Sequence, residues 1–352
     1  MRTTFVSTIS LWNSSKSTLD KLQSGLTKAN TELTTGRHAD VGLALGHKVG
    51  ESLSLRQQRA EIDTLTDSNG LAIQRLKTTT AALDSIRENA TKFRDALVGL
   101  PSNPPVETVK GQAAAYMSSL VGDLNVSIGG RYVFGGINTT TAPANGYANG
   151  VPSSLKDLVA SAFAAPVASG GFGFPQSDPL ASGISPADME AFLDGPFRQI
   201  FEGPDWSAFS NASDQNIQSL ISPTEKVETS TNANTTPIRQ IAMAYTMIFD
   251  LGIETLSPAT RDMVIMKAAR VLSTAVSGVT DVQASIGTAQ AKADSANVRM
   301  DLQKAIFEER IGKLEAVDPA EAKVRVDQLM TQIQTSYSLT AQLKQLSLIN
   351  YL

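Results

Sequence analysis

The residues that could do chemistry in this chain are few and scattered. The sequence has no cysteine, which excludes disulfides, thiolate catalysis and cysteine-bound zinc. Its two histidines, His38 and His47, stand outside any HExxH-like spacing and have no carboxylate cluster around them. We therefore expect neither a metal site nor a cofactor, and we interpret His38 as a solvated loop residue.

Three other patterns resemble functional sites but lack essential parts of them. Asp188 with Glu190, and Glu308 with Glu309, are carboxylate pairs of a kind that ordinary helices carry. A glycosidase would need two carboxylates about 5–10 Å apart in a cleft, and nothing in the sequence singles out such a pair. Residues 170–173, Gly-Gly-Phe-Gly, lack the strand, spacing and following helix of a nucleotide-binding loop. We predict that this loop is a set of turns and that the chain is not an enzyme.

The composition favours long helices over a large aromatic core. Of the 352 residues 41% are hydrophobic but only 6% are aromatic, and the length allows two or three domains. A net charge of -4 disfavours nucleic acid as a partner. We expect no membrane insertion because no apolar run approaches 18 residues. The first residues lack the apolar stretch of a Sec signal peptide, so export would need another route.

Two long stretches set the architecture. From Leu55 to Leu97 the seam residues recur at alternating spacings of three and four over six heptads, and the same pattern returns from Ile265 to Phe307. Such runs predict rod-like helices that face a partner along one side. A third pattern, over 106–128, follows Pro104-Pro105 and should fold back antiparallel on the first rod helix. Polar seam residues such as Asn69 either fix the register or are tolerated in a partly wet seam.

The two chain ends carry shorter heptads that we predict to form the assembly interface. Helices of 15–30 residues without a nearby core are marginal in water. We expect the end segments to stay mobile in the monomer and to order on assembly, rather than to form a permanently folded pair. The candidate interface residues are Trp12, Leu19, Leu22, Leu26, Leu33, Leu329, Ile333, Leu339, Leu343 and Leu346.

The centre of the chain differs in character from both rods. Residues 139–237 hold ten of the fifteen prolines, and ten acidic residues against three basic ones. Short helices are expected at 153–164 and 186–202, and strands near 206–210 and 217–230. The predicted fold is mainly α, a long antiparallel coiled-coil-like rod built from both chain ends with an inserted irregular α+β domain. The predicted parts are an N-terminal assembly segment and connector (1–44), two rod parts (45–138 and 238–317), the insert (139–237) and a C-terminal assembly helix (318–352).

Three short motifs at fixed places on this layout resemble the flagellin superfamily. The signature Gly130, Arg131, Tyr132, Val133, Phe134, Gly135 and Gly136 follows the third helical pattern. It looks like the one found there in the hook-associated proteins that join hook to filament, the FlgL type. Residues 32–37, Glu-Leu-Thr-Thr-Gly-Arg, and the ending 346–352 are similar to theirs as well.

The resemblance implies a secreted, non-enzymatic subunit of the bacterial flagellum. Such a subunit would leave the cell through the flagellar type III apparatus with an export chaperone. It would assemble with itself into a ring, next to other hook-associated proteins and possibly flagellin. The alternatives are a filament flagellin, a secreted adhesin displayed by the central domain, and a cytoplasmic coiled-coil signalling protein.

Overall fold

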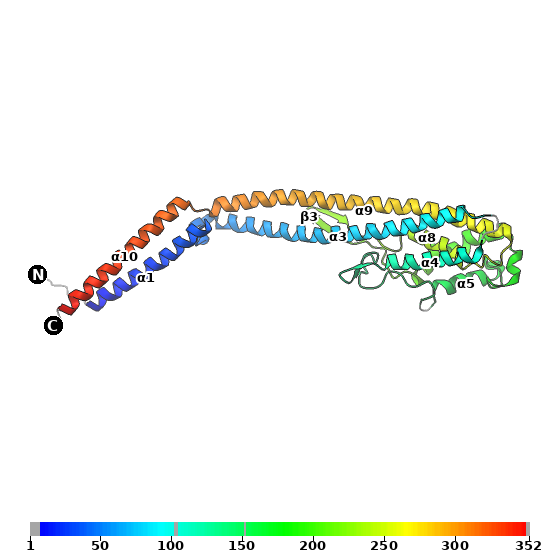
Figure 1. Ribbon diagram of the computed structural model, residues 1–352, viewed down its shortest axis with the longest axis horizontal. Coiled ribbons are helices and arrows are strands. Elements are labelled where there is room, and N and C mark those ends of the chain that lie inside the picture. Colours follow the sequence, from blue (N-terminus) through cyan, green and yellow to red (C-terminus); the bar gives the residue numbers. More distant parts are fainter. Residues whose placement is uncertain (1–7, 102–104, 151–152, 350–352) are drawn as a thin grey trace. The chain divides into compact units, whose positions relative to one another are not determined.

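The protein is described by a computed structural model that covers residues 8–101, 105–150 and 153–349. The chain divides into two compact units, one made of residues 1–64 with 300–352 and the other of residues 65–299. The two longest helices, α3 (Val49–Val98) and α9 (Pro258–Glu315), contribute to both units (Figure 1). We describe the first as the terminal unit and the second as the central unit.

In the terminal unit both chain ends form helices. Gly36, at φ +69°, ends the first of them, since glycine readily adopts this left-handed conformation. Pro319 opens the last helix, as proline suits a first helical turn. Besides its parts of α3 and α9, this unit contains α1 (Thr8–Thr35), α2 (Val41–Leu45), the 3-10 turn η1 (Gly46–Lys48) and α10 (Pro319–Ile349).

The connector over residues 36–50 contains four glycines but also regular structure. Asp40 caps a short helix there, because its carboxylate accepts a hydrogen bond from the backbone N–H of Leu43 at 3.0 Å. The many glycines of this stretch made a helix capped by Asp40 hard to predict from the sequence. Most of the connector is therefore helical or turn structure.

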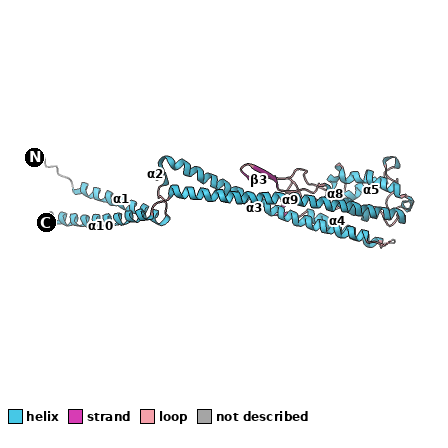
Figure 2. Ribbon diagram, turned by 90° about the horizontal axis from the view of Figure 1, so that it is seen from above, coloured by secondary structure: helices cyan, strands magenta, loops and turns pink. Residues whose placement is uncertain are grey.

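The helices α1 and α10 lie side by side, as both Figure 1 and Figure 2 show. Across them, Gln23 Nε2 donates a hydrogen bond to Tyr337 Oη at 3.1 Å. Each of the two seams therefore has a partner in the same chain, whereas the mobility of the end segments before assembly stays a prediction.

The central unit contains the remaining elements. Here α3 and α9 run antiparallel, with Gln283 Nε2 donating to Asp84 Oδ1 at 2.9 Å. Helix α4 folds back on α3 as predicted, joined to it by a hydrogen bond from Ser85 Oγ to Asp123 Oδ2 at 3.0 Å. The helices are α4 (Val106–Leu124), α5 (Leu155–Ala164), α6 (Pro186–Phe192), α7 (Arg198–Glu202) and α8 (Thr236–Phe249). The strands are β1 (Ser127–Ile128), β2 (Arg131–Tyr132), β3 (Gln218–Ser222) and β4 (Glu225–Glu228), and the shorter turns are η2 (Val167–Ser169), η3 (Pro179–Gly183), η4 (Leu193–Phe197) and η5 (Pro204–Ala208).

One hydrophobic core runs through the central unit. Phe93 of α3, Tyr116 of α4 and Tyr245 of α8 meet with ring centroids 5.3–5.9 Å apart. The same core includes Phe163 of α5 and Phe209 after η5. The insert predicted for residues 139–237 therefore has no core of its own but shares one with α3, α4, α8 and α9.

The short elements of residues 139–237 match the predictions in part. The helices expected at 153–164 and 186–202 are present as α5, α6 and α7, and the pair β3–β4 lies within 217–230. The strand expected near 206–210 is wrong, since η5 covers most of it. Trp206 is buried there and donates from Nε1 to Asn234 Oδ1 at 2.9 Å.

Among the described residues, α9 alone has the length and composition of a membrane span. Some of its apolar side chains, among them Leu272, Ala275 and Val279, are buried in the core of the central unit, whereas Val298 and Leu302 are exposed.

Candidate assembly surfaces

Six of the predicted interface residues are partly buried on α1 and α10, which pack against each other. Leu22 and Leu26 of α1 and Leu329 of α10 are half-buried, as are Leu19, Leu33 and Ile333. Gly25 of α1 faces the Leu329 side chain, and an added Cβ would lie 3.6 Å from it, an ordinary van der Waals distance. Only Ala29 is a fully buried apolar residue in the described part of α1. The two helices therefore pack together with only partial burial of the residues between them.

Other apolar side chains of α10 are only partly covered by α1. Leu339, predicted for the interface, is 54% exposed, Met330 is half exposed, and the ring of Tyr337 is half exposed although its hydroxyl accepts from Gln23. Val324 is also exposed. Helix α10 therefore carries more apolar surface than α1 covers. The side chains of Trp12, Leu343 and Leu346 lie outside the described residues.

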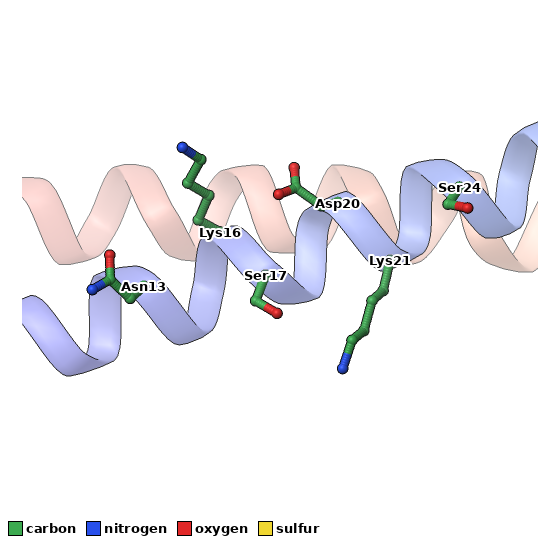
Figure 3. Close-up of a pocket in the computed structure, with 6 residues that line it drawn as sticks. All are labelled: Asn13, Lys16, Ser17, Asp20, Lys21 and Ser24. Atoms are coloured by element: carbon green, nitrogen blue, oxygen red, sulfur yellow. The ribbon is translucent and has the colours of Figure 1, made fainter.

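A second stripe of α1 is polar (Figure 3). Two lysines in it, Lys16 and Lys21, extend in different directions, and Asp20 lies between them. These residues line a shallow hollow of about 470 Å³ whose walls come from a single helix. Such mixed charges on one helix suit a solvated face. The residues of the stripe are Asn13, Lys16, Ser17, Asp20, Lys21 and Ser24.

A buried carboxylate stands where α9 ends. Glu315 is fully buried, and it accepts hydrogen bonds from Ser52 Oγ at 2.6 Å and from Arg56 Nε at 3.0 Å, both on α3. Arg37 Nη1 lies 3.9 Å from its Oε2. The hydrogen bond from Arg56 is the main reason that the pKa of Glu315 lies below its usual value. Glu315 is therefore held as a carboxylate.

A second buried carboxylate stands at the end of α1. Glu32 Oε2 accepts from Arg325 Nη1 of α10 at 3.0 Å. Its Oε1 accepts from the backbone N–H of Ala39 at 3.2 Å, and His38 Nδ1 lies 3.8 Å away. Glu32 thus links α1, the connector and α10.

Backbone hydrogen bonds join the chain segments that carry these two carboxylates. The N–H of His38 donates to the Glu315 carbonyl and the N–H of Val317 donates to the Gly36 carbonyl, each at 3.0 Å. We call Glu32, Glu315 and their partners the joint. Sequence reasoning missed it, because a single glutamate in a helical pattern looks like a surface charge. The one available signal was the place of Glu32 within the motif at 32–37.

The signature at residues 130–136 forms a set of tight backbone contacts in the central unit. Gly129 and Gly130, both at positive φ, make the two-residue turn between β1 and β2 instead of ending the helix. Phe134 is fully buried, and its carbonyl accepts from the N–H of Ala233 at 2.9 Å. Gly136 leaves no room for a side chain, since a Cβ would lie 2.5 Å from the carbonyl oxygens of residues 213 and 215.

The other signature residues fit the same description. Arg131 is exposed and Tyr132 is half-buried, and the N–H of Tyr132 donates to the Thr139 carbonyl at 2.8 Å. At Gly135 a Cβ would lie 2.3 Å from the Asn138 carbonyl oxygen. The signature therefore ties the end of α4 to the returning segment before α8.

The carboxylates considered for catalysis have structural partners instead. Asp188 caps α6 together with Ser185, and Glu190 Oε1 lies 3.3 Å from Lys267 Nζ. Glu308 pairs with Arg59 at 3.6 Å, and Glu309 pairs with Lys313. Within the part of the chain that the structure describes, no group of three or more His, Asp or Glu side chains could hold a metal ion.

Comparisons with known proteins agree with this layout. Residues 6–139 match the family model of the bacterial flagellin N-terminal helical region, and residues 270–352 match that of the C-terminal helical region. A solved structure from Vibrio parahaemolyticus, provisionally described as a flagellar hook-associated protein, is similar to 75% of this chain and 95% of its own. Its sequence identity is 12% and its TM-score is 0.49. No curated protein matches the sequence.

The two matched regions together cover more than half of the chain and contain the terminal helices α1 and α10, most of α9, and the signature. They fall on both sides of the residues that α5–α8 occupy. Membership of one family explains both the order of the helices and the two matched regions. This chain belongs to the flagellin family.

Proposed function

We propose that this chain, a structural subunit of the flagellum, joins the hook to the filament. The observation that supports it is the surplus of apolar surface on α10. Val324, Met330 and Leu339 stay at least half exposed beside α1. Apolar side chains that one partner helix leaves uncovered are covered when further helices pack around the pair.

The energetics of the terminal pair favour completion by assembly. Each apolar side chain that moves fully out of water contributes about 1.5–3 kcal/mol. In α1 and α10 the seam leucines are only half-buried, so they realise only part of that contribution. Packing against copies of the same pair would supply the remainder.

The joint supports a mechanical role for this pair. Glu32 connects α1 to α10, and Glu315 connects the end of α9 to α3. Removing one partner from a buried ion pair is costly, so the connector should keep its path under load. The proposed subunit performs no reaction and acts through its contacts.

The proposed partners follow from the same reading. Copies of the chain form a ring, other hook-associated proteins and flagellin adjoin it, and an export chaperone binds the ends before assembly. The proposed route out of the cell is the flagellar type III apparatus, without a Sec signal. The three motifs resemble those of hook-filament junction proteins, and this resemblance supports the proposed position between hook and filament.

Export and assembly can be tested separately. In cells, the chain should reach the medium only when the flagellar export apparatus is intact. A strain lacking the chain should keep its hooks but release flagellin into the medium. Export that is independent of the apparatus would contradict the flagellar route.

A second experiment distinguishes a junction subunit from a filament flagellin. The purified chain should not grow long filaments at high concentration, as seen by electron microscopy. Long filaments formed by the chain alone would instead identify it as a filament subunit and overturn the junction role.

A further inference from the structure

The central unit contains an aromatic cavity that the flagellar role does not use. It has a volume of about 530 Å³ and lies between the loop at 170–174 and helix α6. Phe172, Phe174 and Phe192 line it. The rings of Phe172 and Phe192 are 5.2 Å apart, and those of Phe172 and Phe174 are 6.2 Å apart. This volume is in the range of sites for small molecules.

The glycines of the loop allow this cavity to form. At Gly171 a Cβ would lie 2.3 Å from the Ala165 carbonyl oxygen, so only glycine lets the loop pass the end of α5. Directly after it, the N–H of Phe172 donates to the Phe163 carbonyl at 2.8 Å. The loop thereby places the Phe172 ring against Phe163 and Phe192 and leaves it partly buried.

Two exposed aliphatic side chains extend the apolar lining of the cavity. Val167 is 75% exposed and Leu180 is 65% exposed, and both line the cavity. Together with the partly buried Phe172 and Phe174 they make the lining of the cavity mostly apolar.

The cavity has a single charge. Asp188 is its only ionisable lining residue among those the structure describes. Its Oδ2 accepts from Ser185 Oγ at 2.7 Å, and its Oδ1 accepts no hydrogen bond within the described part of the chain. Glu190, two residues later, is instead engaged by Lys267. An anion would meet only this carboxylate and no positive side chain.

Phenyl rings and a carboxylate around one cavity favour a particular class of ligand. The faces of aromatic rings attract cations, most strongly those with a weakly hydrated, alkylated surface. A nearby carboxylate adds a Coulombic attraction that neutral ligands lack. We propose that this cavity binds a small, free organic cation of the alkylated ammonium type, with its charge beside Asp188.

The proposal is tested on the full chain with three compounds of similar shape. They are choline, its neutral analogue 3,3-dimethyl-1-butanol and the anion 3,3-dimethylbutanoate. Isothermal titration, with nuclear magnetic resonance to locate the shifts, should show choline binding about tenfold more tightly than the neutral analogue. The anion should not bind. Equal binding of choline and the alcohol, or no binding of either, would overturn the proposal.

Two variants assign the preference to the carboxylate. Asp188→Asn should remove the tenfold difference while leaving weak binding of the alcohol. The matched control Glu190→Gln removes a carboxylate that faces Lys267 and should leave the difference unchanged. A preference for choline that survives in Asp188→Asn would contradict the role of Asp188.

A third variant separates ring faces from apolarity in general. Phe174 is only partly buried, so Phe174→Leu should keep the fold, which circular dichroism checks. Choline binding should weaken several-fold and binding of the alcohol should change little, because leucine has no ring face. Equal weakening of both compounds would show that the cavity takes apolar ligands without regard to charge, and the proposal would fail.

Discussion

The helix α8 and the pair α1–α10 bury their apolar residues to different degrees. Nine of the fourteen residues of α8 are buried. In the described part of α1 the buried residues are Ala29 and Glu32, and the seam leucines are half-buried. Helix α8 lies in a core formed with α3, α4, α5 and α9, whereas α1 has α10 as its described partner.

The heptad seams of α1 and α10 thus show which side of each helix packs against a partner, but not how deeply its side chains are buried. The burial of the side chains depends on how many layers of secondary structure surround the helix. The central unit supplies these layers from its own chain. We infer that the terminal pair obtains them from neighbouring copies, and the predictions below test this contrast from the largest expected effect to the smallest.

Removing a core ring should show the full cost of a buried side chain. Phe93 is completely buried against Tyr116 and Tyr245, so Phe93→Ala should lower the free energy of unfolding of the central unit by about 3–5 kcal/mol. The matched change in the terminal pair, Leu26→Ala, should cost less than about 1 kcal/mol because Leu26 is half-buried. Urea unfolding followed by circular dichroism measures both. Equal costs would remove the contrast.

The signature glycine should also be sensitive. Gly136→Ala places a Cβ 2.5 Å from two carbonyl oxygens at a φ of +60°, so we expect a loss of about 2 kcal/mol or more. Gly70 in α3 has open space around it, and Gly70→Ala should raise stability by up to about 1 kcal/mol. Thermal unfolding compares the two variants. An unchanged stability of Gly136→Ala would show that these tight backbone contacts are not needed for folding.

The joint should give a smaller, pH-dependent effect. Because the folded state lowers the pKa of Glu315, this carboxylate stabilises the terminal unit at neutral pH, and the contribution is lost as the pH falls below 4.5, the ordinary value for glutamate. Glu315→Gln should cost about 1–2 kcal/mol at pH 7, a value reduced because Arg56 is half exposed.

At pH 3 the same variant should differ less from the natural chain. The control Glu309→Gln changes an exposed glutamate one and a half turns earlier on α9 and should have little effect at either pH. Unfolding curves at pH 7 and pH 3 provide the comparison. A cost of Glu315→Gln that stays constant with pH would contradict the assignment.

Charging the exposed face of α10 should leave the monomer almost unchanged. Met330→Asp with Leu339→Asp alters side chains that are at least half exposed, so the monomer should lose no more than about 0.5 kcal/mol. Assembly should fail, because two charges would enter an apolar contact. Gln328→Asp with Gln332→Asp adds the same charge at exposed polar positions of α10 and should assemble. Sedimentation distinguishes the outcomes, and assembly of the first variant would exclude this face from the interface.

The long helices could be predicted because their signals are local. The heptads of 55–97 and 265–307 lie within α3 and α9, and the assembly helix predicted from residue 318 corresponds to α10, which begins at Pro319. The shared core could not be predicted in this way. Seven of the twelve phenylalanines fall between residues 163 and 209, and an average aromatic content of 6% concealed that concentration. No local pattern shows that Phe163 packs in the same core as Tyr245.

The candidate surfaces show the same limit. The seam leucines follow from spacing, and the structure places six of them between α1 and α10. The joint depends on contacts across long sequence separations, such as Ser52 with Glu315, which no spacing rule contains. The cavity beside Phe172 likewise needs the approach of Gly171 to the end of α5.

Hydrogen exchange tests the central claim that assembly completes the terminal pair. Amides in helices with little buried contact exchange through local opening, and burial by a partner slows them. In dilute monomer we predict fast exchange in α1 and α10 and slow exchange in α8, with α1 and α10 becoming as slow as α8 after assembly. Slow exchange of α1 and α10 already in the dilute monomer, unchanged by assembly, would contradict the account.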